Sequence, residues 1–102
     1  LSPKTIELMT SDQLEYLGIQ PGSLLGGNGT SFGLGFSIRT EKNQAASVGS
    51  VGTFGWGGLF NTKFWIDPVE DMVFVGMTQI FPDYHPEFWD RLYAIIYGSL
   101  EN

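Results

Sequence analysis

Glycines around a single tryptophan, in the run Gly55-Trp56-Gly57-Gly58, constrain the fold of this chain more than any other stretch. The run lies within β-forming sequence that extends from residue 52 to residue 66. Glycine weakens the interior of a strand, so glycines at this density indicate a bulge, a close backbone approach or a bound group. A tight bend packed against a neighbouring element explains the pattern equally well. Both interpretations predict a strand whose backbone other groups approach closely.

Composition limits the classes of function. The chain has 102 residues, enough for one small domain or a piece of a larger one, and it is 42% hydrophobic. Its formal net charge is -6 and its few cations are scattered, which argues against a surface for nucleic acid or anionic membrane. No apolar run has the length of a membrane span. The absence of cysteine leaves the compartment open, because exported bacterial and cytoplasmic proteins both fit.

The first third of the chain predicts a helix followed by one strand. Ser2 is suited to an N-cap and Pro3 to the first helical position. Residues 10–12 could interrupt this helix and recap a second short turn through Leu17, which Gly18 then stops. Residues 20–31 have the composition of a loop. Residues 32–39 alternate between apolar and small or polar side chains, which predicts a single half-buried strand.

The remainder predicts further strands and a closing helix. Strands are expected at residues 52–58 and 62–66, a turn at 67–71, and a strand covered on both faces at 72–79, because that run is apolar throughout. An amphipathic helix should run from Pro86 to Gly98. This order predicts an α+β fold in which an antiparallel β-sheet is flanked by N-terminal and C-terminal helices.

Isolated polar residues suggest no further chemistry. His85 has no Asp or Ser at a convincing position to complete a catalytic set, so we interpret it as a loop or cap residue. Asp67, Glu70 and Asp71 have the composition of a solvated turn, and a hard-cation site there is the weaker alternative. We therefore predict no cofactor and no metal.

Four short motifs together resemble a known superfamily. They are residues 33–36, 54–58, 64–68 and 73–79, followed by the terminal amphipathic helix. In order and spacing they are similar to the C-terminal part of the serine β-lactamase-like hydrolases, which include class C β-lactamases, DD-peptidases and family VIII esterases. The resemblance covers nearly the whole chain. It implies a partial β-lactamase/transpeptidase-like fold, in which residues 1–102 form a single C-terminal segment of a larger domain.

The resemblance also implies site residues. The third motif of the superfamily falls on Trp56, Gly57 and Gly58, which would contact the substrate. The backbone N–H of Leu59 would be one of two oxyanion donors, and rigid backbone with open space in front of it suits that role. Trp56 stands where β-lactamases have a lysine, and an indole offers no charge to a substrate carboxylate. Ester hydrolysis is therefore favoured over β-lactam hydrolysis.

The nucleophile motif of the superfamily, Ser-x-x-Lys, is absent. Its second motif, Tyr-x-Asn or Tyr-x-Ser, is matched only by Tyr97-Gly98-Ser99, which lies at the end of the predicted C-terminal helix and follows the third motif instead of preceding it. The chain alone is therefore predicted to be inactive, and the parent protein to be a serine hydrolase that forms an acyl-serine intermediate. A non-catalytic module that binds peptides or cell-wall fragments is the alternative. The expected partners are the N-terminal remainder of the protein or a second copy of this chain, together with a small ester or β-lactam-like substrate.

Overall fold

Two short helices begin the chain, and capping residues define both. The computed structural model describes residues 1–19, 29–40, 49–81 and 86–100. Helix α1 spans Pro3–Met9, and the Ser2 hydroxyl accepts the Thr5 N–H at 3.2 Å. Helix α2 spans Gln13–Tyr16, and the side chain of Asp12 caps its first turn. The predicted interruption and recapping of the N-terminal helix are confirmed.

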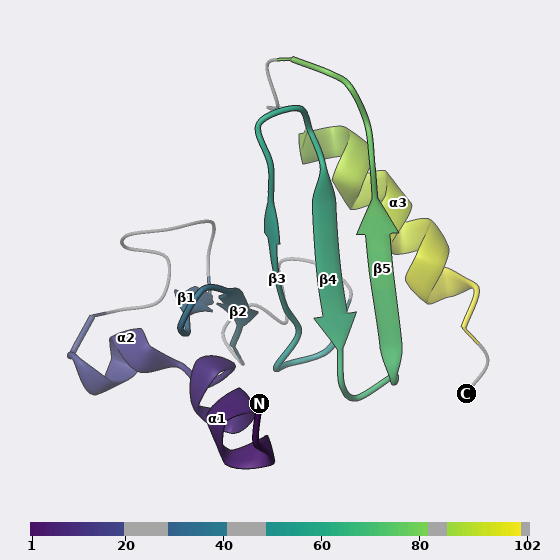
Figure 1. Cartoon of the computed structure of the whole chain (residues 1–102). Coiled ribbons are helices and arrows are strands. Elements are labelled where there is room, and N and C mark those ends of the chain that lie inside the picture. The colour runs from purple at the N-terminus through teal and green to yellow at the C-terminus, as the bar shows by residue number, and fades with distance from the viewer. Residues whose placement is uncertain (20–28, 41–48, 82–85, 101–102) are drawn as a thin grey trace.

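Within the described residues, an antiparallel sheet of five strands, in the order β1-β2-β3-β4-β5, forms the body of the molecule (Figure 1). Helix α3, at Pro86–Gly98, follows the sheet. The predicted α+β arrangement of an antiparallel sheet with N-terminal and C-terminal helices is confirmed. The strands are β1 Thr30–Phe32, β2 Ser37–Arg39, β3 Phe54–Gly57, β4 Lys63–Asp67 and β5 Met72–Gly76.

The prediction of one strand across residues 32–39 is wrong. The stretch is a tight hairpin in which β1 pairs with β2, and Phe32 lies opposite Ser37. Gly35 has a φ of 95°, a conformation that glycine adopts without steric cost and that a continuous strand excludes. Gly33 lies so close to the Met9 carbonyl oxygen that a side chain there would clash with it. The alternating pattern is therefore compatible with a turn, because glycine occupies two of the turn positions.

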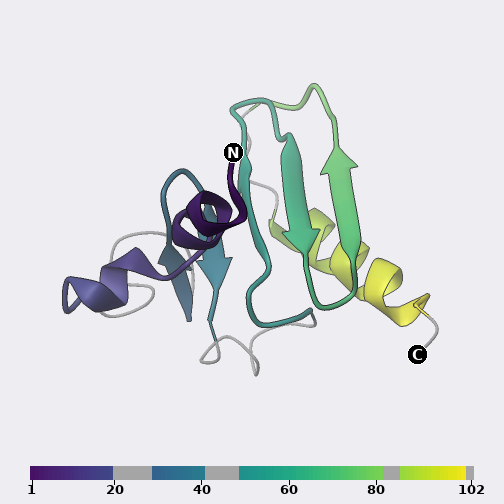
Figure 2. The same ribbon diagram turned by 60° about the horizontal axis from the view of Figure 1, so that its bottom comes forward.

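Helix α3 covers one face of the sheet and α1 lies on the other (Figure 2). The core beneath α3 is centred on Trp65, which is only 1% exposed and stacks on Phe74 at 4.1 Å and on Tyr93 at 3.9 Å. Trp89 packs against Gly76, where a β-carbon would come within 2.8 Å of the indole. The helix can approach β5 this closely because position 76 has no side chain.

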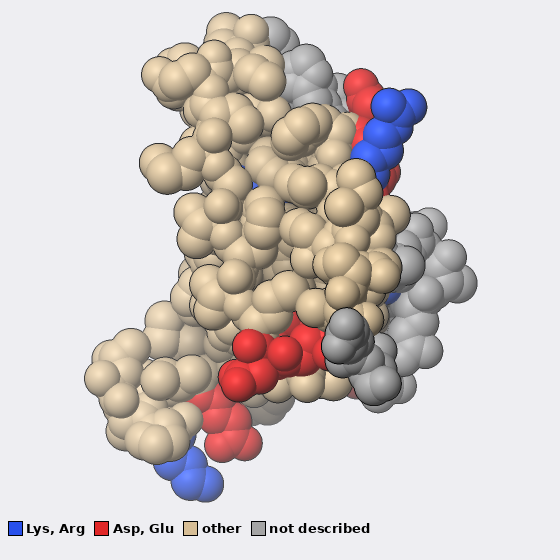
Figure 3. Space-filling view, turned by 90° about the vertical axis from the view of Figure 1, so that its right-hand side faces the viewer, with Lys and Arg blue, Asp and Glu red and all other residues tan. Residues whose placement is uncertain are grey.

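The other face is covered only in part, which corrects the expectation that β5 is buried on both sides. Val73 is 67% exposed and Val75 is 63% exposed. Strand β5 is the last strand of the sheet and forms one of its edges. The side of the molecule on which β5 and α3 lie is almost free of charged residues over its centre (Figure 3). Within the described residues, no helix has the length and hydrophobicity needed to cross a membrane.

Candidate functional site

The site residues lie where the β3–β4 hairpin turns. The Gly58 N–H donates to the Thr62 carbonyl oxygen at 3.0 Å, and the Asn61 N–H donates to the Gly58 carbonyl oxygen at 3.2 Å. Asn61 has a φ of 64°, a left-handed conformation that asparagine tolerates better than most residues. Residues 58–61 therefore form a tight turn whose direction is fixed by hydrogen bonds.

These bonds determine which way the Leu59 N–H points. The two ends of a trans peptide unit point in opposite directions, and the Gly58 carbonyl is directed into the turn toward Asn61. The Leu59 N–H must therefore point away from β4. The Gly57 carbonyl and the Gly58 N–H belong to one peptide unit, and this N–H points toward β4. The Gly57 carbonyl therefore points away from β4.

Among the described residues, no strand pairs with the part of the edge that these groups face. Strand β2 pairs with β3 only at Phe54 and Gly55, so the pairing ends before Gly57. Among the backbone hydrogen bonds of the described residues, none outside the regular strands and helices uses the Leu59 N–H. A donor and an acceptor are thus available side by side at the rim of the sheet.

Trp56 lies beside this edge, on the face opposite α3. It is paired with Phe64 across β3 and β4, and its ring meets Phe32 edge-on at 5.5 Å. The indole is 45% exposed, so a large aromatic surface remains open to a ligand. The predicted substrate-contact residue therefore lies next to the predicted donor.

The glycines of the run have different explanations. A β-carbon at Gly55 would clash with the Phe64 carbonyl, and one at Gly58 would clash with the Thr62 hydroxyl. Close packing against β4 and the turn that leads into it therefore explains why glycine occupies positions 55 and 58. A β-carbon at Gly57 would lie 3.3 Å from the Thr62 carbonyl oxygen, a tight contact without a clash, and Gly57 itself is exposed. Gly57 is therefore the glycine of the run that packing explains least.

The turn is held from two directions by residues that the sequence did not single out. The Thr78 hydroxyl lies 2.7 Å from the carbonyl oxygens of both Phe60 and Asn61. The buried indole N–H of Trp89 donates to Asn61 Oδ1 at 2.8 Å. A buried tryptophan usually has a partner for its N–H, but the sequence does not tell which residue that partner is. The donor at Leu59 is thus carried by an anchored turn.

Lys63, the cation nearest in sequence to the run, does not replace the missing lysine. It pairs with Gly57 but shares the α3 face with Trp65, and its Nζ lies 5.7 Å from the centre of the Trp89 ring. Burial lowers the pKa of Lys63, and the nearby Asp90 carboxylate opposes that effect. The ammonium is therefore separated from Trp56 by the sheet.

The described residues supply no activated nucleophile at this edge. The Ser37 hydroxyl donates to the Gly55 carbonyl oxygen at 3.0 Å, and Ser31 is hydrogen-bonded to Asp12. His85 lies outside the described residues. Across the described ranges, no group of three potential ligands lies close enough to hold a metal ion. Asp67 instead accepts hydrogen bonds from the N–H groups of the turn that follows β4.

Solved structures share this architecture. Simvastatin synthase (LovD) from Aspergillus terreus, as its LovD6 mutant, superposes with a TM-score of 0.73 at 23% identity over 96% of this chain and 28% of that one. EstCE1, a hydrolase with promiscuous acyltransferase activity, gives a TM-score of 0.71 at 26% identity over 96% of this chain and 25% of that one. The chain has part of a β-lactamase-like fold. The neighbours also give it a general structural relation to hydrolases and acyltransferases.

Two curated proteins are similar in sequence. Protein Rv1367c of Mycobacterium tuberculosis strain H37Rv and uncharacterized protein MT1414 of strain CDC 1551 are each 33% identical over 89 residues, which is 81% of this chain and 22% of those proteins. No protein-family model matches the chain. The chain spans about a quarter of the length of these relatives and of the two solved structures.

Proposed function

We propose that this chain is the C-terminal segment of a serine hydrolase that cleaves esters, and that it supplies one wall of the active site. The observation that supports this proposal most strongly is the direction of the Leu59 N–H, which points from an anchored turn toward an open edge beside Trp56. A fixed backbone donor that faces open space is the element that stabilises an oxyanion during acyl transfer.

The proposed reaction divides the work between this chain and the rest of the protein. A serine hydroxyl outside the chain attacks the ester carbonyl carbon and passes its proton to a base, also outside the chain. The carbonyl oxygen becomes an oxyanion that accepts the Leu59 N–H. The alcohol then leaves with a proton and water hydrolyses the acyl-serine. Trp56 contacts an uncharged acyl or alkoxy group, and a β-lactam carboxylate would find no cation at that position.

The N-terminal remainder of the protein is the proposed partner, and β5 is the proposed place of contact. The backbone N–H and C=O groups of Phe64 point toward β3. Because these groups alternate in direction along a strand, those of Trp65 point toward β5 and form hydrogen bonds with Phe74. The N–H and C=O groups of Val73 and Val75 then point outward. An uncharged strand edge with free backbone groups is a surface that proteins normally pair or cover. A second copy of this chain is the alternative partner.

A non-catalytic module is the second candidate function. The Gly57 carbonyl and the Leu59 N–H together offer an acceptor and a donor to an extended backbone, which suits the binding of a peptide or a cell-wall fragment. Both candidates use the same edge. They differ in whether a nucleophile faces it.

The coding sequence upstream of Leu1 tests the choice directly. A Ser-x-x-Lys motif there, with hydrolysis of a chromogenic short-chain ester by the longer protein, supports the hydrolase. If that longer protein has no such motif and no turnover but binds peptides, the hydrolase proposal is wrong and the binding module is right. Turnover by the 102-residue chain alone would also contradict the proposal, because it would require a nucleophile within these residues.

A further inference from the structure

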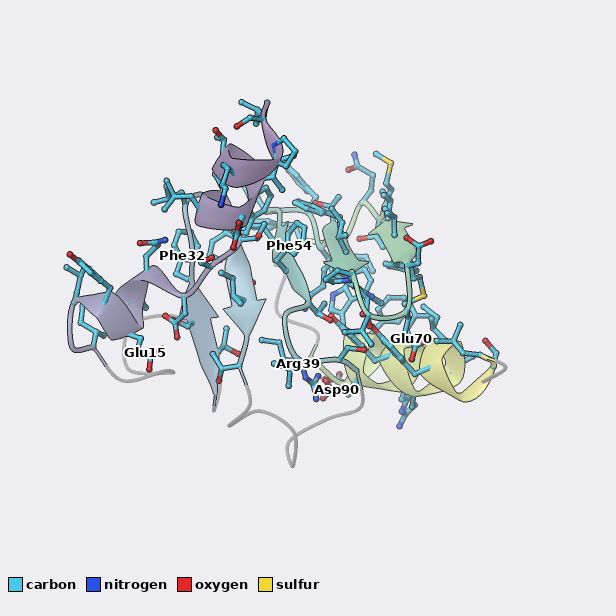
Figure 4. The ribbon with its side chains drawn as sticks, turned by 90° about the horizontal axis from the view of Figure 1, so that it is seen from below. Glu15, Phe32, Arg39, Phe54, Glu70 and Asp90 are labelled. Atoms are coloured by element: carbon cyan, nitrogen blue, oxygen red, sulfur yellow. The ribbon has the colours of Figure 1, made fainter. Side chains whose placement is uncertain are left out.

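A concave surface lies at the opposite end of β3 from Trp56. It is an open cleft of about 590 Å³ between α1 and the turn that joins β4 to β5. Its position on the α1 side of the sheet can be followed in Figure 4, where Phe54 is labelled. Apolar residues of both the helix and the sheet line it: Ile6, Phe54, Ile66, Met72 and Val73.

The polar groups of the cleft are acceptors, and two of them are free carboxylates. Glu7 and Asp71 line the cleft, and both are exposed. Asp67 also lines the cleft, but its side chain is fully buried and its oxygens accept the Val69 N–H and the Tyr97 hydroxyl. None of the described residues that line the cleft is basic.

The hydroxyl groups of the lining are already used. Thr10 Oγ1 donates to the Ile6 carbonyl oxygen at 2.9 Å, and Ser11 Oγ donates to the Glu7 carbonyl oxygen. The cleft therefore offers an incoming group an apolar floor and two negative charges. An aliphatic chain that ends in a cation satisfies both parts, because its stem can cover the floor while its head stays near the carboxylates.

We propose that this cleft binds a lysine or arginine side chain of the N-terminal remainder of the protein, the partner proposed above to pair with the edge of β5. Val73 belongs both to the cleft and to the exposed face of β5, so a strand laid along β5 would pass beside the cleft. Acidic side chains gather along the lower margin of the uncharged face in Figure 3. Charge complementarity thus selects a basic residue at the end of the covering segment. The inference uses the proposed cover as the source of the cation and does not depend on the hydrolase activity.

Nuclear magnetic resonance titration of the whole chain tests the proposal. The probe is N-acetyl-lysine methylamide, and N-acetyl-norleucine methylamide is the matched control that keeps the stem and lacks the charge. We expect saturable shifts at the amides of Glu7, Asp71 and Val73. We expect the norleucine compound to bind at least about fivefold more weakly, as the loss of two exposed ion pairs implies. Salt should weaken only the lysine compound.

A double variant, Glu7→Gln with Asp71→Asn, tests the same point from the protein side. Asparagine accepts the left-handed backbone of position 71, where φ is 54°, so the turn should be kept. Lysine binding should fall by about fivefold or more, with the rest of the spectrum unchanged. If this variant fails to fold, the two probes on the native chain still decide the matter.

Several results would overturn the proposal. Equal binding of the lysine and norleucine compounds would show that the carboxylates select nothing. Shifts confined to other parts of the chain would place the cation elsewhere. Binding of hexylammonium without binding of the lysine compound would indicate a site for free amines and not for a polypeptide. The hydrolase proposal would survive each of these outcomes, because it rests on the opposite end of β3.

Discussion

The hydroxyl of Tyr97 donates a 2.6 Å hydrogen bond to Oδ2 of Asp67, which is fully buried. The bond joins the last turns of α3 to the end of β4. The second carboxylate oxygen accepts the N–H groups of Val69 and Glu70, so one side chain organises both the turn after β4 and the docking of the helix. Burial alone would raise the pKa of Asp67, but these hydrogen bonds, together with one from Ser50, outweigh it and lower the pKa.

Acid should therefore destabilise the fold through Asp67. A lowered folded-state pKa gives stability that is present above the unfolded value of about 4 and is lost as the pH falls through the folded value. Asp67→Asn should flatten this dependence and cost about 1–3 kcal/mol at neutral pH, because an amide cannot accept with both of its atoms. Urea unfolding monitored by tryptophan fluorescence between pH 2 and 7 measures both effects. An unchanged acid slope would remove Asp67 from this role.

Alkali should act through Tyr93. Burial raises the pKa of Tyr93 to about 12. The charge of Arg39 opposes this rise, and the charge of Asp67 adds to it. Stability linked to a raised pKa is present below the unfolded value of about 10 and is lost as the pH rises toward the folded value. Tyr93→Phe keeps the ring stacked on Trp65 and should remove part of the loss above about pH 10. The free energy of unfolding is measured at pH 8 and pH 11 for the native chain and for Tyr93→Phe. An identical loss of stability in both proteins would contradict the prediction.

The bond between Asn61 and Trp89 should be worth more than an exposed hydrogen bond. Trp89→Phe leaves Asn61 Oδ1 buried without its donor, which should cost about 1–3 kcal/mol beyond the lost packing. Asn61→Gly preserves the positive φ and removes the acceptor. A double-mutant cycle of the two changes, measured by chemical unfolding, should give a coupling of about 0.5–3 kcal/mol. Additive effects would show that the turn is not held by this bond.

Leu59→Pro is the direct test of the proposed oxyanion donor in the longer protein. Proline removes the N–H, and Leu59 occupies the second position of the turn from Gly58 to Asn61, where proline is well accepted. The turnover number for a short-chain ester should fall by about 10²–10³-fold, while Leu59→Ala, which keeps the N–H, should leave it within a few fold. Equal losses of turnover in Leu59→Pro and Leu59→Ala would show that the leucine side chain, and not the N–H, supports the reaction. Gly58→Pro is a poorer test, because the Gly58 N–H bonds Thr62.

Charge on the edge of β5 should suppress association of the isolated chain. Val75→Lys places an ammonium on a strand whose outward backbone groups are free, and lysine on an edge opposes further pairing. Val69→Lys adds the same charge to an exposed turn residue and serves as the control. Sedimentation velocity over a range of concentrations should show fewer oligomers only for Val75→Lys. Monomeric native chain at all concentrations would show that the edge is harmless by itself.

Helix caps, β-branched runs and turn residues were readable from the sequence, because each acts within a few residues. Ser2, Asp12 and Gly18 mark helix ends by local hydrogen bonding or backbone freedom, and the structure confirms them. The sequence did not reveal the hairpin turn at residues 33–36, because the alternating pattern continues through Gly33 and Gly35, which also permit a turn. Burial of β5 was overestimated because an apolar strand does not reveal whether its cover belongs to the same chain.

The site was predictable to a similar depth. Trp56, Gly57, Gly58 and Leu59 do lie together at a turn of the sheet, while their roles in binding and catalysis remain predictions. The direction of the Leu59 N–H could not be read from the sequence, because it depends on the hydrogen bond that closes the turn at Asn61. The supports from Thr78 and Trp89 join segments far apart in the chain, and no local pattern announces them.

The turn at residues 58–61 has a consequence for how such proteins diverge. The proposed donor belongs to the backbone, so its direction survives any replacement at position 59 that keeps an N–H. Selection on that function would act on Gly58, Asn61 and Trp89, which hold the peptide plane, and would leave the residue that bears the donor free to drift. Among relatives that share this function, we therefore expect the residue at position 59 to vary more than Gly58, Asn61 and Trp89.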